Sequence, residues 1–290
     1  MILLLRFLLP LLLYALIFVA PIWADSAREI MQKVFDRYEG NTEINISTLT
    51  TYRYAVKDGK DVCIETPRVI TTKNIRKNYG PRLKDIKTIL IIMSPPRDRG
   101  ISFLQHDYEQ KEADQWIYLS TFKKLKRIIS GNENEPKIGC IFGSEISYED
   151  MEKKYIHFYT YKTIKTITYR KRPCVIIECL PTPEQSKKSN YSKEVRWIDT
   201  EHSLTLKAVL FNRQGKKVKR IIYRKLELVD GIMWCHQMRV KNYETLRKSV
   251  WDYNKIKFNI PVTDAFISQR TLLDKAFREK NLTNMEKYLE

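Results

Sequence analysis

A long series of strand-like segments separated by short turns is the feature that most constrains this fold. Turn signals stand at Lys57–Gly59, Asn212–Lys216 and Asp230–Gly231, each between runs rich in β-branched and aromatic residues. Roughly ten strands follow one another at hairpin spacing, without the strand–helix alternation of a parallel sheet. The pattern predicts a mainly β (α+β) protein with one large antiparallel sheet, and a sheet of this size tends to curl.

Both ends of the chain beyond residue 25 predict helices that would cover this sheet. Ser26 and Glu29 have the spacing of a capping box, and apolar residues recur on one helical face up to Tyr38. The stretch from Val262 onward is also helical in character and increasingly charged. Helices on the concave side of a curled sheet leave either a filled core or a lined cavity, and the sequence leaves both open.

The first 24 residues predict a signal peptide. One cation, Arg6, precedes an apolar run from Phe7 to Trp23, and Ala24 offers a small residue at a cleavage point. An uncleaved membrane anchor is the alternative, because the apolar run is close to the shortest that spans a bilayer as a helix. No linker divides the rest, so residues 25–290 are expected to form one exported domain.

The chain is strongly basic, with 52 Lys and Arg against 34 Asp and Glu and a formal net charge of +18. Such a charge favours anionic membrane surfaces and lipid headgroups, and a solvated basic surface is the simpler alternative. Export makes nucleic acid a poor candidate partner. The five cysteines and four histidines show no metal-ligand spacing, so neither a metal nor a cofactor is expected.

An acidic cluster beside Ser144 is the strongest candidate for catalysis. Glu145, Glu149 and Asp150 have the chemistry of general acid–base groups, but such acids equally cap turns and pair with nearby cations. No nucleophile elbow, zinc-binding helix or phosphate-binding loop accompanies them, and Ser144 has no visible base. We therefore expect structural roles for these residues and no enzymatic activity.

Five aromatic residues are candidates for a ligand-binding wall. An ordinary sheet core and the lining of an apolar cavity need the same residue types, so both interpretations stay open. The five residues are Phe103, Trp116, Tyr118, Phe122 and Phe142.

A basic run, Lys123–Arg127, follows the strand-like segment that contains Trp116 and Tyr118. It is either a solvated edge, which discourages strand-to-strand aggregation, or a contact for an anionic headgroup or membrane. Arg127 is the residue expected near the mouth of a cavity.

Several longer segments resemble the bacterial outer membrane lipoprotein-sorting protein family. In the first half these are PPRDRGISFLQHDY, DQWIYLSTFKKLKRI and GCIFGSEISYEDM; in the second they are VRWIDTEHSLTLKAVLFNRQGKKVKRI, VDGIMW and FNIPVTDAFISQRTL. The resemblance covers nearly all of the chain after residue 25. Two departures are Ser120, where the family usually has proline after Tyr-Leu, and Glu145, which replaces the usual aspartate after Gly-Ser.

The resemblance implies an unclosed β-barrel, a strongly curved antiparallel sheet covered by a few helices. It also implies a periplasmic lipid- or lipoprotein-binding protein that shields acyl chains in an apolar cavity during transport or sorting to the outer membrane. The alternative is an envelope-stress sensor or an accessory module of a resistance-nodulation-division-class transporter. The cargo and the oligomeric state stay open.

Overall fold

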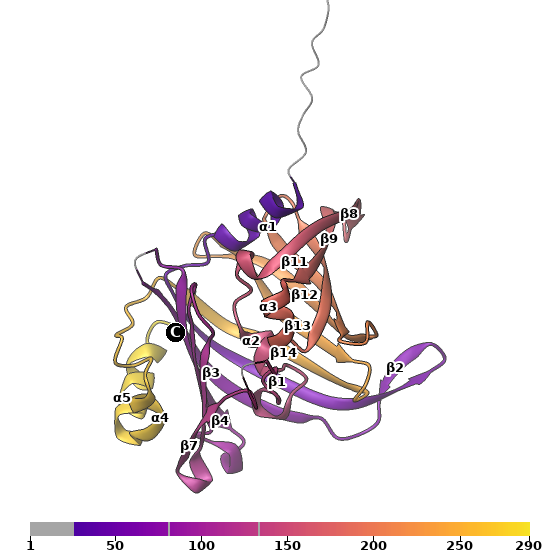
Figure 1. Ribbon diagram of the computed structural model, residues 1–290. Helices are drawn as coiled ribbons and strands as arrows, with labels where there is room; N and C mark the ends of the chain where they lie inside the picture. The colour runs from indigo at the N-terminus through magenta and orange to yellow at the C-terminus, as the bar shows by residue number, and fades with distance from the viewer. Residues whose placement is uncertain (1–25, 81, 133) are drawn as a thin grey trace, which may run out of the picture.

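The computed structural model of the protein describes residues 26–80, 82–132 and 134–290 (Figure 1). The signal peptide predicted over residues 1–24 lies outside these ranges. No helix within them combines the length and apolar character needed to cross a membrane.

One antiparallel sheet of 14 strands dominates this part of the chain and confirms the predicted fold class. The strand order is β7-β6-β5-β4-β3-β1-β14-β13-β12-β11-β10-β9-β8, with β2 paired to β1. The strands are β1 (Thr42–Lys57), β2 (Lys60–Cys63), β3 (Arg68–Tyr79), β4 (Asp85–Ser94), β5 (Ser102–Asp107), β6 (Asp114–Leu119), β7 (Lys124–Ile128), β8 (Tyr159–Tyr169), β9 (Arg172–Pro181), β10 (Tyr191–Asp199), β11 (Leu204–Asn212), β12 (Lys217–Val229), β13 (Ile232–Asn242) and β14 (Arg247–Phe258).

Five short α-helices and four 3-10 turns accompany the sheet in the described ranges. They are α1 (Ala27–Asp36), α2 (Tyr148–Met151), α3 (Pro183–Lys188), α4 (Gln269–Leu273), α5 (Lys275–Glu286), η1 (Pro96–Asp98), η2 (Ser120–Phe122), η3 (Ile141–Gly143) and η4 (Ile156–Phe158). The capping box predicted at the start of α1 is confirmed: Ser26 Oγ accepts from the Glu29 amide at 3.2 Å, and Glu29 accepts from the Ser26 amide at 2.7 Å.

The predicted hairpin turns join β1 to β2, β11 to β12 and β12 to β13. Asp58 and Gly59 both have positive φ, 50° and 70°, which is the two-residue turn that matches the twist of the flanking strands. Asp230 and Gly231 repeat this geometry at 49° and 78°.

The sheet curves around its own interior but does not close, because the edge strands β7 and β8 form no ladder with each other (Figure 1). Four residues of the basic run Lys123–Arg127 lie in the edge strand β7. Its cations Lys124, Lys126 and Arg127 are exposed, which agrees with the interpretation of this run as a solvated edge.

The outer face of the sheet is covered by the two C-terminal helices. Strand register aligns Ile44 with Ile75, Ile75 with Ile89 and Ile89 with Leu104 on this face. These side chains form one cluster with residues of α4 and α5, including Leu272 and Leu282. The sequence predicted helices on the concave side of the sheet. This prediction is wrong for α4 and α5, which lie outside the curve (Figure 1).

The concave face is partly filled by the segment from Cys140 to Met151. Ile141, Phe142 and Ile146 of this segment pack against buried residues of several strands. These include Phe103 of β5 and Trp251 of β14. Phe142 and Gly143 adopt positive φ, 48° and 70°, and so turn the chain tightly inside the sheet. Figure 1 shows α2, at the end of this segment, in the middle of the curve. Helix α1 packs against β8 and β9, at one edge of the sheet (Figure 1).

Candidate binding cavity and the charged cleft beside it

A cavity of about 420 Å³ remains on the concave face, which is within the range typical of small-ligand pockets. Residues of α1, the Ile146–Lys153 segment and eight strands line it. The apolar and aromatic side chains among them are Val34, Ile86, Leu90, Ile146, Met151, Leu204, Ile221, Tyr223, Trp234, Met238, Val240, Trp251 and Tyr253. The concave side is therefore neither wholly filled nor wholly hollow.

The aromatic wall of the cavity is held by strand alternation on β14. Trp251 and Tyr253 are two residues apart, so both point to the concave face, and their rings stack 5.8 Å apart at 8°. Trp234 of β13 meets Tyr253 edge to face, with ring centroids 6.3 Å apart. The Trp251 indole donates to Ser47 Oγ at 2.6 Å, which fixes the orientation of its ring.

The adjoining wall, on β1 and β3, is polar. Arg76 Nε donates to Glu43 at 3.1 Å, Asn45 donates to Glu43 at 2.7 Å, and Asn74 donates to Asn45 at 2.6 Å. Side chains alternate between the two faces of a strand, and Ile44 and Ile75 pack in the outer cluster. The polar residues on either side of them therefore face inward. The prediction of an apolar cavity is thus incomplete, because one wall of the cavity is a buried hydrogen-bond network.

Two buried polar atoms in the cavity lining have no hydrogen-bond partner among the described residues. They are Asn74 Oδ1, an acceptor, and Trp234 Nε1, a donor. Buried polar atoms are normally satisfied, so both are available to water or to polar atoms of a ligand.

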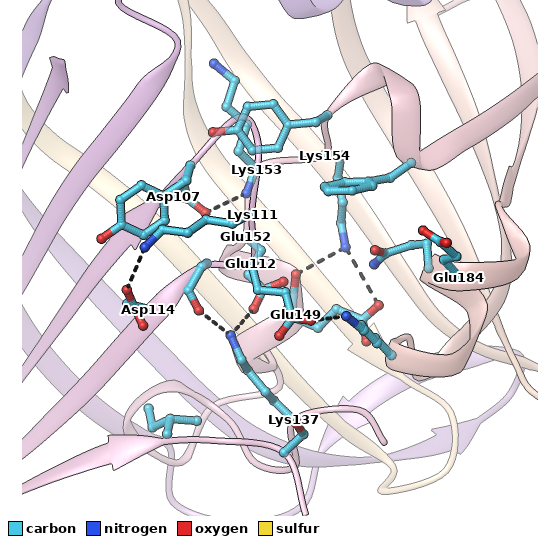
Figure 2. A pocket seen from close by; sticks show the side chains of 18 of the residues that line it. Asp107, Lys111, Glu112, Asp114, Lys137, Glu149, Glu152, Lys153, Lys154 and Glu184 are labelled. Atoms are coloured by element: carbon cyan, nitrogen blue, oxygen red, sulfur yellow. Dashed lines mark hydrogen bonds and ion pairs between the residues drawn. The ribbon is translucent and has the colours of Figure 1, made fainter. Parts of the chain in front are cut away.

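A second, charged cleft of about 600 Å³ lies in the gap between the edge strands (Figure 2). Strand β7 contributes Arg127 and Ile128 to one side, and η4, β8 and α3 form the other. Ion pairs fill it: Lys137 with Glu152 at 2.7 Å, Arg127 with Asp114, and Lys188 with Glu112, which connects the two sides. Burial alone would lower the pKa of Lys154, but Tyr159, Glu149 and Glu194 outweigh it and raise that pKa.

Asp107 lies where the cleft and the cavity adjoin, and it lines both. Asp107 is 3% exposed, and its carboxylate accepts from Gln105 Nε2 at 2.7 Å and from the Lys153 amide at 3.1 Å. Burial without a closely paired cation raises the pKa of Asp107 to about 7.

The acidic residues near Ser144 form hydrogen bonds and ion pairs with neighbouring segments. Glu149 accepts from the Asn190 amide at 2.8 Å and also from Ser189 Oγ. Asp150 is paired with Lys219 and accepts from the Tyr191 hydroxyl at 2.9 Å. Glu145 accepts from Asn242 and Thr245, both at 2.8 Å, and Ser144 Oγ accepts from the Ile146 amide at 3.2 Å.

The five aromatic residues proposed from the sequence as one wall lie in three different places. Phe103 and Phe142 belong to the packed core beneath the cavity, and Phe103 stacks on Tyr148 with centroids 6.0 Å apart. Trp116 and Tyr118 face outward into the cluster with α4 and α5. Phe122 is 75% exposed in η2, so its expected place in a cavity wall is wrong.

None of the five lines the cavity, and Arg127 lies at the charged cleft, paired with Asp114. The sequence reasoning missed the residues that do line the cavity, above all Trp251 and Tyr253. Their spacing by two on a strand was a usable signal, because it places two aromatic rings on one face.

One group of possible metal ligands occurs in the described ranges, formed by Asp199, Glu201 and His202 within 4.8 Å of one another. The Asp199 carboxylate already accepts from Arg172 at 2.9 Å and from the amides of Glu201 and His202 at 2.9 and 3.3 Å. Arg172 also lies 3.1 Å from His202 Nδ1, so a guanidinium occupies the centre of the group. The group caps a turn and is poorly suited to a cation.

Solved structures that share this fold include the following three proteins. A DUF1329 family protein from Desulfovibrio piger matches with a TM-score of 0.75 at 20% identity, over 86% of this chain and 100% of the other. A Vibrio parahaemolyticus protein described as an outer membrane lipoprotein-sorting protein domain matches with a TM-score of 0.73 at 23% identity, over 85% and 98%. A LolA superfamily protein from Nitrosomonas europaea matches with a TM-score of 0.60 at 16% identity, over 84% and 98%.

A family model described as an uncharacterized protein matches residues 84–274. No curated protein matches the chain. The match to the family model spans the strands from β4 to β14 and helix α4, and so includes most of the curved sheet. The chain therefore belongs to this family of uncharacterized proteins, and its fold is that of outer membrane lipoprotein-sorting and LolA superfamily proteins, as the sequence resemblance predicted.

Proposed function

We propose that the protein is a periplasmic carrier that binds the acyl chains of a lipid or lipoprotein in the concave cavity, without catalysing a reaction. Residues 1–24 act as the signal peptide, and residues 25–290 form one binding domain. The observation that carries the proposal is the cavity itself, with Trp251, Tyr253 and Met238 on its wall. Burial of an acyl chain there gains about 0.8 kcal/mol per methylene group.

The gap between β7 and β8 supplies a route to this cavity. The charged cleft occupies the gap, and Asp107 and Lys153 line both hollows. The Lys188–Glu112 ion pair that connects the sides is formed by partly exposed groups, and such pairs contribute little stability. This ion pair would therefore be a weak barrier to a chain that enters laterally through the cleft.

A cavity-blocking variant tests the proposal. Met238→Trp places an indole in the cavity, whereas the control Leu228→Trp adds the same side chain at a position that is 67% exposed. Both are purified from the periplasm and titrated with the neutral fluorescent probe N-phenyl-1-naphthylamine and with dodecanol. We expect Met238→Trp to bind at least about tenfold more weakly, because a lost set of buried methylene contacts exceeds 1.4 kcal/mol.

Leu228→Trp should bind as the wild type does. Equal binding by the two variants, with unchanged thermal unfolding, would refute the cavity as the binding site. A Met238→Trp protein that does not fold would be replaced by Val240→Leu, which fills less of the same wall.

A second candidate is a sensor or accessory module that contacts another envelope protein, such as a resistance-nodulation-division-class transporter. The β1–β2 hairpin favours it, because it extends away from the sheet (Figure 1) and exposes Val56, Val62 and Ile64. A protein partner that co-purifies in place of lipid, and is lost on Val56→Ser with Ile64→Ser, would favour this candidate.

A further inference from the structure

Lys153 occupies a singular position in the concave face. Three adjoining hollows meet there: the cavity, the charged cleft and a smaller space of about 280 Å³ under α1. Lys153 is the residue common to the linings of all three. Its backbone is fixed by the hydrogen bond from its amide to Asp107, at the end of the segment that fills the concave face.

Three cations near Lys153 are each paired with an acid. Arg37 pairs with Glu39 at 2.5 Å, Arg76 with Glu43 at 3.1 Å, and Lys84 with Asp36 at 2.6 Å. Lys153 differs from these three cations because its ammonium has no paired carboxylate among the described residues.

The Lys153 ammonium forms no ion pair or hydrogen bond with the described residues, and it lies 4.8 Å from the centre of the Phe35 ring. Asp107 and Glu39 attract it from a distance, whereas Arg76 and Lys84 repel it. Burial is the largest influence and lowers the pKa of Lys153, so the charge is poorly solvated where it lies. A partly buried cation without a partner favours an incoming anion, since pairing offsets its desolvation.

We propose that Lys153 binds the anionic headgroup, a carboxylate or a phosphate, of an acyl-chain ligand whose tail lies along the Met238 and Trp251 wall of the cavity. The inference rests on the proposed function and names its ligand class: a lipid with an anionic head, in place of a neutral one. The unpaired ammonium of Lys153 and its position between the cavity and the cleft carry it together.

Three ligands with the same twelve-carbon tail test this assignment: dodecanoate, dodecyl phosphate and dodecanol. Each displaces N-phenyl-1-naphthylamine from wild type, Lys153→Met, Lys153→Arg and a control, Lys165→Met. Lys165 is an exposed lysine on the outer strand β8, so its loss changes the net charge equally without changing the cavity.

We expect the wild type to bind at least one anionic ligand about tenfold more tightly than dodecanol, the size of one charge-assisted hydrogen bond. Lys153→Met should lose this preference while it still binds dodecanol, and Lys153→Arg and Lys165→Met should keep it. The relative affinities of dodecanoate and dodecyl phosphate distinguish a carboxylate head from a phosphate head, and displacement by inorganic phosphate alone would indicate a site for free phosphate.

Two outcomes overturn different claims. If all three ligands bind equally, or if Lys153→Met keeps the wild-type preference, the headgroup assignment is wrong and the carrier function stands. If none of the ligands binds, dodecanol included, the proposed function itself fails.

Discussion

Replacement of Asp107 by asparagine should change how stability depends on pH, with a sign set by burial. The carboxyl has an ordinary pKa of 3.8 and a pKa of about 7 in the folded protein. Between these values the unfolded chain loses its proton while the folded protein keeps it, so the free energy of unfolding falls as pH rises. Below pH 3.8 and above pH 7 the group contributes no further slope.

The magnitude follows from the width of that window. Each pH unit within it costs about 1.4 kcal/mol, so between pH 5 and pH 8 the wild type should lose about 3 kcal/mol relative to Asp107→Asn. The asparagine side chain is neutral throughout and nearly the same size, so other titrating groups cancel in the difference. Urea unfolding of both proteins at pH 5, 6, 7 and 8 measures it.

Asp114→Asn is a control with the opposite sign. Burial of Asp114 is outweighed by Arg127 and Tyr108, whose hydrogen bonds lower its pKa. Its removal should therefore cost stability at neutral pH, with no gain as pH rises from 5 to 8. Parallel pH profiles for wild type and Asp107→Asn would refute the reasoning, because they would show that Asp107 is ionised in the folded protein throughout this range.

Two further predictions concern packing and capping. Phe103→Ala should lower the free energy of unfolding by about 3–5 kcal/mol, because the ring is fully buried. Phe122→Ala, at an exposed ring, should change it by less than about 0.5 kcal/mol. Urea unfolding measures both, and similar losses in the two variants would contradict the placement of these rings. Ser26→Ala should lower the free energy of unfolding by about 1 kcal/mol, because it removes the cap of α1. Thermal unfolding tests this, with Ser186→Ala in α3 as the control at an exposed serine. Equal stability of the two variants would show that the cap is not formed.

Local chemistry made the strands and turns predictable. The Asp-Gly pairs at Asp58 and Asp230 require positive φ at both residues, which specifies the hairpin independently of the rest of the fold. The capping box at Ser26 is local in the same way. Strand β7 was missed because its lysines and arginine carry little strand propensity, and it pairs with β6 only at an edge.

The cavity was harder to predict because it depends on which face of each strand lies inside. On β1 the inward side chains change from polar to apolar, from Glu43 and Asn45 to Leu49, while Ile44 faces outward. Alternation alone predicts two faces but does not say which one curves inward. The outer cluster with α4 and α5 decides this, and it depends on contacts across more than 200 residues of sequence.

The same ambiguity explains the aromatic candidates. Phe103 and Trp116 lie on neighbouring strands, but Trp116 pairs with Leu104, so the two rings face opposite sides of the sheet. The segment that fills the concave face lies between β7 and β8 and meets residues of β1, β4 and β14 only in the folded protein. No spacing within that segment indicates how much of the cavity it occupies.

Native mass spectrometry of the protein purified from the periplasm, followed by organic extraction and lipid analysis, tests the central claim most directly. The account predicts a bound acyl-chain species at near-stoichiometric level, lost in Met238→Trp and kept in Leu228→Trp. A protein that carries no lipid and takes up neither N-phenyl-1-naphthylamine nor a fatty acid would contradict it, and the cavity would then be no lipid-binding site.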